Sequence, residues 1–493
     1  MYPTSTRHAR TLARASTLLV GIMGGCVRGS PDSQRTETGS GPHPDSHPDS
    51  VLPADSTTES TAESARESAA ESNRDTGVID GPLIVSWGDL HGHSGLSFDG
   101  CEDPTALCMP ADLTPGAHFF ENAATNGLAF AALTDHAEYS RIQVPTEGTD
   151  LSIWDTAKAL VAAADGGPVV PILGFEWTAG HTSGHRTVLL EDPASCEAYR
   201  IPGPAPTDGG SRAGGQVTFL ANPLPAVTDA ATFAAEVDAA GSGSGCVPTR
   251  WLSFLHHVAY YPPAAVDWSQ SSYSLATDTV VEMASEHGSS ECADPTAPGC
   301  DWRVQTDFYQ PAGAVQVALQ LDHELGFVGG TDRHDSDPGR LDIGGGPTGH
   351  LVDSDGDGVD DGPQYQFTSG TLTGVITPSP LTRAGIFDAL EARHTYVASW
   401  LPTGLSVTAT SAGLDYLPGD EVPAGALSVA VDLADPNVSD WSAEIVDATG
   451  AAVPTAGAET VLTPTAGQAL YVRIDATVGG VAQRAWASPF FIR

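Results

Sequence analysis

The fold of this chain is decided by the stretch Val85-Ser86-Trp87-Gly88-Asp89-Leu90-His91-Gly92-His93. It begins as a short apolar run typical of a buried strand, and it ends in a His-x-His pair. Because successive side chains of a strand point to opposite faces, His91 and His93 lie on the same side. Two imidazoles held together at a strand end suit a metal ion better than an apolar core. A pair of surface histidines in a glycine-rich turn is the alternative interpretation.

Further apolar runs follow along the chain and alternate with helix-like stretches. Strands are predicted over residues 83–88, 128–134, 169–175, 186–190, 251–255, 279–283, 326–330 and 372–376. Helices are predicted over residues 115–126, 152–164, 229–239, 311–324 and 383–393. Continuous apolar strands that alternate with helices are typical of a parallel sheet covered by helices, and this many units favours an α/β barrel.

Polar residues lie at the ends of these predicted strands. In barrels the functional residues gather where the carboxyl ends of the strands meet. Strand ends that repeatedly carry His, Asp or Glu therefore indicate a metal site with nitrogen and oxygen ligands, rather than a scatter of structural polar groups. The residues concerned are Asp135, His136, Glu176, His185, His256, His257, Asp332 and His334.

The chain has 493 residues, which bounds its number of domains, and a formal net charge of -41, which restricts its partners. The length suits two or three domains. A surface this acidic argues against nucleic acid as a partner, because binding a phosphate backbone requires basic side chains. Most of the acidic residues are expected on a solvated surface.

The N-terminal region resembles an export signal. Arginines at positions 7, 10 and 14 precede a short apolar run and the small residues before Cys26. Such a brief apolar run is typical of a signal peptide rather than a membrane span. Residues 1–26 therefore resemble a lipoprotein-type signal peptide with Cys26 lipidated, which predicts a bacterial outer-membrane or cell-surface lipoprotein; a secreted or periplasmic protein is the alternative. Residues 27–79, rich in Ser, Thr, Pro and acidic side chains, predict a disordered linker.

Six further cysteines suggest disulfide bonds, because their number is even and the chain is expected to be exported. Two pairs each bracket a short loop, so local pairing is expected, and the third pair would close a longer insertion. The expected pairs are Cys101–Cys108, Cys292–Cys300 and Cys196–Cys246. The absence of Cys-x-x-Cys spacing argues against a zinc-thiolate site.

From residue 403 the pattern changes to short alternating strands between Gly, Pro and Asp turns. Strands are predicted at residues 405–410, 427–431, 443–446 and 469–474. This pattern predicts a β-sandwich-like domain over residues 403–493. Nothing in it suggests catalysis, so a structural or docking role is expected.

Four motifs, in order, resemble those of the PHP (polymerase and histidinol phosphatase) superfamily. They are Gly88-Asp89-Leu90-His91-Gly92-His93-Ser94, Leu133-Thr134-Asp135-His136, Gly174-Phe175-Glu176 and Thr331-Asp332-Arg333-His334. Residues 384–396 and 485–489 further resemble a secreted, largely uncharacterised branch with a C-terminal β domain. The resemblance covers residues 83–493. It implies an α/β fold, with a distorted (β/α)7 barrel over residues 80–402 that holds two or three divalent ions (Zn, Mn or Fe).

The resemblance also implies a set of metal ligands. Glu176 would bridge two ions, His257 competes with His256, and His181 competes with His185. The implied ligands are His91, His93, Asp99, His136, Glu176, His185, His256, Asp332 and His334.

The function implied is an exported metal-dependent hydrolase in which a hydroxide bridging the metals attacks the substrate. A phosphoesterase acting on a small anionic molecule is the leading hypothesis; branches that look similar hydrolyse carbamates, esters or amides. No Gly-x-Ser-x-Gly motif supplies a side-chain nucleophile. A non-catalytic surface binding module is the competing class, but a degenerate barrel would have lost several of the ligands that this sequence keeps.

Two further residues are candidates for catalysis. His287 follows a predicted strand and is expected to touch substrate or to protonate a leaving group, with ordinary loop polarity as the alternative. Arg333 lies between two implied ligands and could grip an anionic substrate, although strand alternation points it away from the metals. The remaining histidines are expected to be structural or exposed: His118, His323, His350 and His394.

An acidic stretch resembles the first half of an EF-hand-like calcium loop. Its alternating carboxylates, followed by glycine, are those of Asp353, Asp355, Asp357 and Asp361. The twelfth position is Gln364 instead of Glu. One bound Ca²⁺ is therefore a possible cofactor, and a merely acidic loop is the alternative.

Overall fold

The structure is a computed structural model. It describes residues 82–97, 116–136, 153–178, 184–192, 233–235, 237–238, 250–260, 266–269, 277–300, 309–341, 370–455 and 459–493. All of them belong to one compact unit, Val78–Arg493. Within this part of the chain, no helix is both long and apolar enough to cross a membrane.

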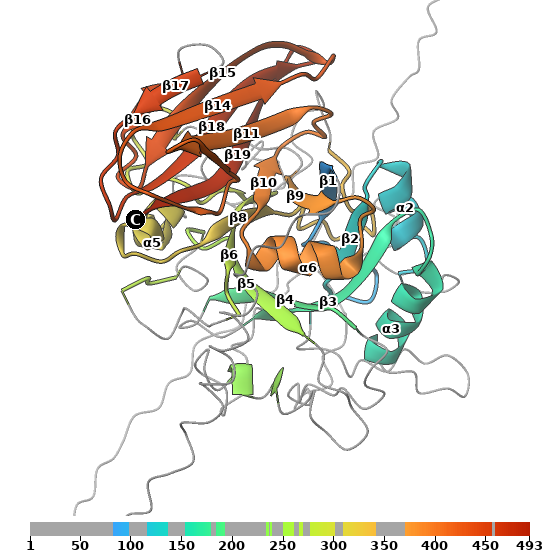
Figure 1. Cartoon of the computed structure of the whole chain (residues 1–493). Helices are drawn as coiled ribbons and strands as arrows, with labels where there is room; N and C mark the ends of the chain where they lie inside the picture. Colours follow the sequence, from blue (N-terminus) through green and yellow to red (C-terminus); the bar gives the residue numbers. More distant parts are fainter. Residues whose placement is uncertain are drawn as a thin grey trace, which may run out of the picture. The chain divides into compact units, whose positions relative to one another are not determined.

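A large mixed sheet organises the first part of the unit (Figure 1). Its hydrogen-bonded order is β10-β9-β1-β2-β3-β4-β5-β6-β7, and β8 pairs with β6. The strands are β1 (Leu83–Asp89), β2 (Phe130–Leu133), β3 (Val170–Thr178), β4 (His185–Leu190), β5 (Trp251–His256), β6 (Val280–Ser285), β7 (Gly288–Ser289), β8 (Gly326–Gly329), β9 (Leu372–Pro378) and β10 (Thr395–Ala398). Every residue of β2, β6 and β8 is buried, as their continuous apolar runs require.

The predicted α/β class is confirmed, but the prediction of a wholly parallel sheet is wrong. Strands β1, β2 and β3 are parallel, as are β5, β6 and β8. Strand β4 runs antiparallel to both β3 and β5, and β9 runs antiparallel to β1. Only residues 179–184 separate β3 from β4. This connection is too short for the crossover that a parallel neighbour requires, so the chain simply reverses.

The end of β1 lies beside the end of β8. Gly92 forms a parallel bridge with Arg333. The amide of His93 donates to the carbonyl of Arg333 over 2.8 Å, and the amide of Asp332 donates to the carbonyl of His91 over 2.7 Å. These bonds bring the first and the last of the predicted motifs together, although they are single bridges and not a ladder that closes a barrel.

Four helices occupy predicted positions: α2 (Phe119–Thr125), α3 (Ile153–Ala164), α5 (Val315–Gln320) and α6 (Arg383–Glu391). Helix α5 is shorter than predicted, because the 3-10 turn η4 (Pro311–Gly313) precedes it and Asp322 takes a left-handed conformation at φ 61° beyond it. Helix α6 begins after Thr382, whose hydroxyl accepts a hydrogen bond from the amide of Gly385. Of the predicted helix over residues 229–239, residues 233–235 and 237–238 are described and are helical.

The C-terminal part consists of strands in two sheets. They are β11 (Leu405–Ser411), β12 (Leu414–Tyr416), β13 (Glu421–Val422), β14 (Leu427–Leu433), β15 (Val438–Asp447), β16 (Ala452–Pro454), β17 (Glu459–Leu462), β18 (Ala469–Val478) and β19 (Val481–Ile492). One sheet has the order β12-β11-β14-β17. The other, β16-β15-β18-β19, continues into the first sheet because β19 pairs with β10. One hydrogen-bonded sheet therefore crosses the predicted domain boundary at residue 402, which stays a prediction.

The expected disulfide Cys292–Cys300 is present. The other expected pairs, Cys101–Cys108 and Cys196–Cys246, lie outside the described residues. So do the signal-like segment with Cys26, the linker over residues 27–79 and the acidic loop with Asp353, Asp355, Asp357 and Asp361.

Candidate metal centre

Four side chains converge where β1, β3 and β8 end. The Nε2 atom of His91 lies 3.3 Å from Glu176 Oε2 and 3.2 Å from Asp332 Oδ1. The Nε2 atom of His93 lies 3.2 Å and 3.3 Å from the same two oxygens. Two ligands that are each about 2.0–2.1 Å from one zinc ion at a tetrahedral angle are about 3.3–3.4 Å apart. All four residues are buried, so the spacing of this central group fits one divalent ion.

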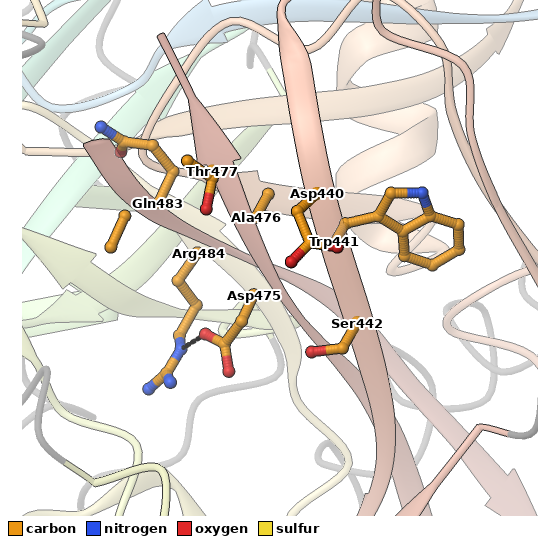
Figure 2. A pocket seen from close by; sticks show the side chains of 9 residues that line it. Asp440, Trp441, Ser442, Asp475, Ala476, Thr477, Gln483 and Arg484 are labelled. Carbon is orange, nitrogen blue, oxygen red and sulfur yellow. Dashed lines mark hydrogen bonds and ion pairs between the residues drawn. The ribbon is translucent and has the colours of Figure 1, made fainter. Parts of the chain in front are cut away.

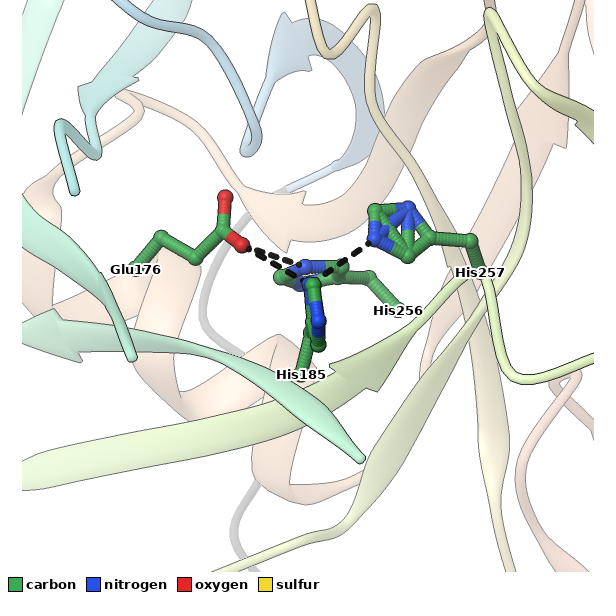
Figure 3. A group of neighbouring side chains, drawn as sticks. All are labelled: Glu176, His185, His256 and His257. Atoms are coloured by element: carbon green, nitrogen blue, oxygen red, sulfur yellow. Dashed lines mark hydrogen bonds and ion pairs between the residues drawn. The ribbon is translucent and has the colours of Figure 1, made fainter. Parts of the chain in front are cut away.

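A second group surrounds the other oxygen of Glu176 (Figure 3). Glu176 Oε1 lies 3.2 Å from His185 Nδ1 and 3.2 Å from His256 Nε2. The ring of His257 approaches the same place, with its Nε2 3.3 Å from His185 Nδ1. Glu176 therefore presents one oxygen to each of two groups, which is the geometry of a carboxylate that bridges two ions.

Asp332 is arranged in the same way as Glu176. While its Oδ1 belongs to the central group, its Oδ2 lies 3.1 Å from His287 Nε2 and 3.5 Å from His257 Nδ1. His257, His287 and Asp332 thus form a further set whose ligand atoms could hold an ion. His287, expected at the substrate, lies in direct contact with an implied metal ligand.

A fourth set surrounds His93. The rings of His93 and His334 stack with centroids 4.1 Å apart, and those of His93 and His136 stack at 4.8 Å. These three histidines bring their ring nitrogens close enough to hold one ion. Asp99, which the resemblance implies as a ligand, lies outside the described residues.

Hydrogen bonds to Nδ1 orient three of the imidazoles. Glu282 Oε2 lies 2.8 Å from His91 Nδ1, Thr187 Oγ1 lies 2.9 Å from His256 Nδ1, and Ser97 Oγ lies 3.2 Å from His93 Nδ1. A partner at one ring nitrogen fixes the tautomer and leaves the other nitrogen for a metal. In all three rings the nitrogen that remains is Nε2, which faces the carboxylates of the centre.

Sequence reasoning missed two acids that organise the centre. Glu282, in the middle of β6, contacts His91 and accepts a hydrogen bond of 3.1 Å from the amide of His257. Its signal in the sequence was a lone carboxylate inside an otherwise apolar strand. Asp89 accepts from the amides of His91 (3.1 Å), Thr331 (3.1 Å) and Gly339 (2.9 Å), so it joins the ends of β1 and β8.

The pKa values give these groups the charge states of metal ligands. Burial, aided by His91, lowers the pKa of His256 to about 3. Burial and the neighbouring His256 lower the pKa of His257 well below its usual range. Burial opposes ionisation of Glu176, but His136 and His256 hold its pKa well below normal. Near pH 7 the two rings are neutral and the carboxylate is anionic, as metal binding requires.

Two rings of the centre, those of His91 and His287, have raised pKa values and so favour the protonated form when no metal ion is bound. Burial disfavours the charged ring, but Asp332 and then Glu282 raise the pKa of His91 well above its usual value. Burial likewise opposes ionisation of Asp332, whose pKa is nevertheless held well below normal by His91 and His287. A protonated His91 ring therefore places positive charge between Glu282 and Asp332 when no metal ion is bound.

Two residues of the centre have a strained backbone. His257 has φ 33° and Asp332 has φ 56°, in the left-handed region that side-chain-bearing residues rarely adopt. Such strain persists only where surrounding contacts impose it, and it is concentrated at functional sites.

The other candidates lie apart from these groups. The guanidinium of Arg333 forms an ion pair with Asp335. The remaining described histidines have local partners: His118 contacts Glu121, His323 contacts the carbonyl of Trp268, and His394 contacts Asp420. His350 lies outside the described residues. The roles of Arg333 and of the ligands stay predictions.

A pocket of about 330 Å³ lies elsewhere, on β15, β18 and β19 (Figure 2). Within it Arg484 donates to Asp475 over 2.6 Å, and the indole of Trp441 points away from this pair. Its lining consists of Asp440, Trp441, Ser442, Asp475, Ala476, Thr477, Ala482, Gln483 and Arg484. None of the predicted site residues is among them, so this pocket is separate from the metal centre.

The chain is similar to a solved two-domain protein from Bacteroides vulgatus ATCC 8482, described as containing a predicted PHP-like metal-dependent phosphoesterase. The identity is 15%, the TM-score is 0.36, and the match covers 85% of this chain and 98% of that chain. No protein-family model and no curated protein matches the chain.

Proposed function

We propose that this chain is a metal-dependent hydrolase and that it cleaves phosphoesters of small anionic molecules. One observation carries the proposal. Two imidazole nitrogens and two carboxylate oxygens, from His91, His93, Glu176 and Asp332, lie 3.2–3.3 Å apart in a buried group. Nitrogen and oxygen ligands of this kind suit Zn, Mn or Fe. Both carboxylates turn their second oxygen to further histidines, which supports a centre of two or three ions.

The proposed ligands include two residues beyond the set implied by the resemblance. His257 and His287 join because their nitrogens face Asp332 Oδ2. The full proposed set in the described part of the chain is His91, His93, His136, Glu176, His185, His256, His257, His287, Asp332 and His334. When bound, the ions would lower the pKa of water towards neutrality and stabilise charge that develops on the scissile group.

The chain's own residues supply the orientation and the charge. Glu176 and Asp332 are anionic and offset the charge of bound cations, while the neutral ring of His256 offers a lone pair. Glu282 and Thr187 hold two of the rings in the tautomer that presents Nε2. Because these groups are fixed before substrate arrives, little reorganisation is needed during reaction.

The finer features of the fold and the location belong to the same proposal. Parallel β1–β2–β3 and β5–β6–β8 and the bridge between the ends of β1 and β8 support a distorted (β/α)7 barrel. The basic and apolar N-terminal residues before Cys26 support export and a lipid anchor at the bacterial surface.

The test combines metal analysis with a substrate screen. The full chain, purified without chelator, is expected to hold two or more transition-metal ions and to hydrolyse phosphomonoesters or phosphodiesters. His91→Ala should lose metal and activity, while His118→Ala, at an exposed ring, should keep both. A stable protein that binds no metal would overturn the proposal. Turnover of carbamates, esters or amides alone would retain the metal centre and refute the phosphoester assignment.

A further inference from the structure

Side chains of the C-terminal sheet, by which we mean β16-β15-β18-β19, form hydrogen bonds with one buried carboxylate of the first part of the chain, that of Glu291. Glu291 is 2% exposed, and its Oε1 accepts hydrogen bonds from Tyr471 (2.7 Å) and Arg473 (2.9 Å). Its Oε2 accepts from the indole of Trp486 over 2.9 Å. All three donors belong to β18 and β19. Because a buried carboxylate is costly unless its oxygens are bonded, these donors hold Glu291 in one place.

Gln316 links the same C-terminal sheet to the backbone around Glu291. Gln316, at the start of α5, donates to Tyr471 over 2.9 Å and accepts from the amide of Ala293 over 2.9 Å. The amide of Gln316 donates to the carbonyl of Glu291 over 3.1 Å. Burial, and then Glu291, raises the pKa of Tyr471, so the phenol stays protonated and donates. The chain on both sides of Glu291 is therefore immobilised against the C-terminal sheet.

From Glu291 a short, fully bonded segment leads back to the metal centre. The amide of Glu291 donates to Ser289 Oγ over 3.1 Å, and the amide of Ser290 donates to the carbonyl of Met283 over 2.8 Å. Strand β7 pairs antiparallel with the end of β6. His287 directly precedes β7, whose first residue Gly288 has φ 99°, so the backbone between Glu291 and His287 runs through this strand, which is paired with β6.

The same segment also contacts the chain beside the other two members of the group. Ser290 Oγ accepts from the amide of Ala259 over 3.2 Å, two residues after His257. The amide of Glu286 donates to the carbonyl of Thr331 over 3.3 Å, next to Asp332. Residues 286–291, which include His287, thus contact the backbone next to Asp332 and two residues after His257.

We propose that Glu291 is a positioning residue, through which the C-terminal sheet sets His257 and His287 at the metal centre. This inference rests on the proposed function and deepens it. It gives the C-terminal part of the chain a role in positioning two histidines of the metal centre, beyond a structural or docking role. It predicts that breaking a contact on the C-terminal sheet alters the metal-binding geometry around Asp332 through His257 and His287, while the backbone of β3 and β4, which carries Glu176 and His185, stays in place.

The experiment compares Glu291→Gln with a control change on β19, the strand that carries its partner Trp486, in the full-length protein. Gln483→Ala removes a buried contact to Ser399 that does not involve residues 286–291. Outer partners of metal ligands typically contribute about 10–100-fold to affinity. Glu291→Gln should therefore weaken the most loosely held ion by about that factor and change the visible spectrum of the Co²⁺-substituted protein, whereas Gln483→Ala should do neither.

Hydrogen exchange of the metal-free protein separates failure of this inference from failure of the proposed function. With Glu291→Gln, the amides of residues 256–260 and 284–291 should exchange faster, and those of β3 and β4 should not. Should Glu291→Gln fail to fold, Tyr471→Phe, which loses a single donor, is read in its place. Unchanged Co²⁺ affinity and spectrum in a wild type that binds metal overturn the inference. If the wild type binds no metal, unchanged exchange overturns it and faster local exchange supports the positioning role.

Discussion

At the scale of single residues, the carboxylate of Glu282 explains why His91 can serve as a ligand. The acid lies 2.8 Å from His91 Nδ1 and is buried in β6. It would accept the Nδ1–H bond of the neutral ring and so direct the Nε2 lone pair at Glu176 and Asp332. Burial raises the pKa of Glu282, and contact with His91 acts against that rise. The acid is therefore most stable when a cationic or hydrogen-bonding partner is present.

The first prediction concerns this acid. Glu282→Gln keeps the shape of the side chain but removes its charge, so affinity for Zn²⁺ should fall by about 10–100-fold. Competition with a chromogenic chelator measures the change. Glu121→Gln, at an exposed carboxylate paired with His118, is the control and should bind as the wild type does. Equal affinity of Glu282→Gln and the wild type would show that Glu282 does not orient a ligand.

At the scale of elements, close approach between β8 and the end of β1 builds the site. A Cβ atom added to Gly330 would lie 2.3 Å from the Cβ of His91. A glycine is required at this position because the backbone after β8 packs directly against the histidine. The same pairing places Asp332 opposite His91, through a backbone hydrogen bond of 2.7 Å.

The second prediction tests this approach. Gly330→Ala should displace His91 and destabilise the fold by about 1–3 kcal/mol, the usual cost of overpacking. Chemical denaturation gives the free energy of unfolding, and metal analysis gives the ion content, which should drop. Gly385→Ala in α6, where the nearest atom is the Thr382 hydroxyl at 3.2 Å, should keep both close to wild type. Full metal content in Gly330→Ala would contradict the expected tight packing.

Comparison of the elements with the sequence shows what local patterns can predict. The eight predicted strands of the first sheet all occur, because continuous apolar runs bounded by polar residues identify buried strands. The directions of β4 and β9 were missed, because both strands are almost wholly buried and so carry the continuous apolar run that is otherwise typical of a parallel strand. The short strands β7 and β13 have two residues each and no periodicity to detect.

At the scale of the whole molecule, the centre joins segments from residues 91 to 334 of the chain. Four of its buried atoms face ring nitrogens or carboxylate oxygens of neighbouring ligands but make no hydrogen bond of acceptable geometry among the described residues: His93 Nε2, His256 Nε2, His257 Nδ1 and Asp332 Oδ2. A bound ion would satisfy these atoms at once, so metal binding would stabilise the folded chain.

The third prediction follows from this coupling and from its pH dependence. Chelator treatment should lower the melting temperature, and Zn²⁺ or Mn²⁺ should restore it. Without metal, the raised pKa of His91 contributes stability that is complete below about pH 6.5 and is lost as pH rises through the folded pKa. A metal-bound His91 carries no such proton. The gap in melting temperature between metal-loaded and metal-free protein should therefore widen from pH 6 to pH 8.

Calorimetry of both forms at several pH values measures this gap. The low pKa values of His256 and His257 cost stability as pH falls below about 6.5, but they do so in both forms and leave the difference unchanged. A gap that is absent, or that narrows with rising pH, would show that no cation replaces the His91 proton.

The sequence alone determined the α/β class, the positions of the main strands and most members of the centre. It could do so because strand periodicity and residues at strand ends are local properties, and because His-x-His places two rings on one face. The tertiary structure decided which oxygen faces which ring, that β4 runs antiparallel, and that Glu282, His257 and His287 join the centre. It also showed Glu291 bound by the C-terminal sheet. These contacts and strand directions depend on which distant segments of the chain lie side by side, and the pattern within a single segment cannot predict that.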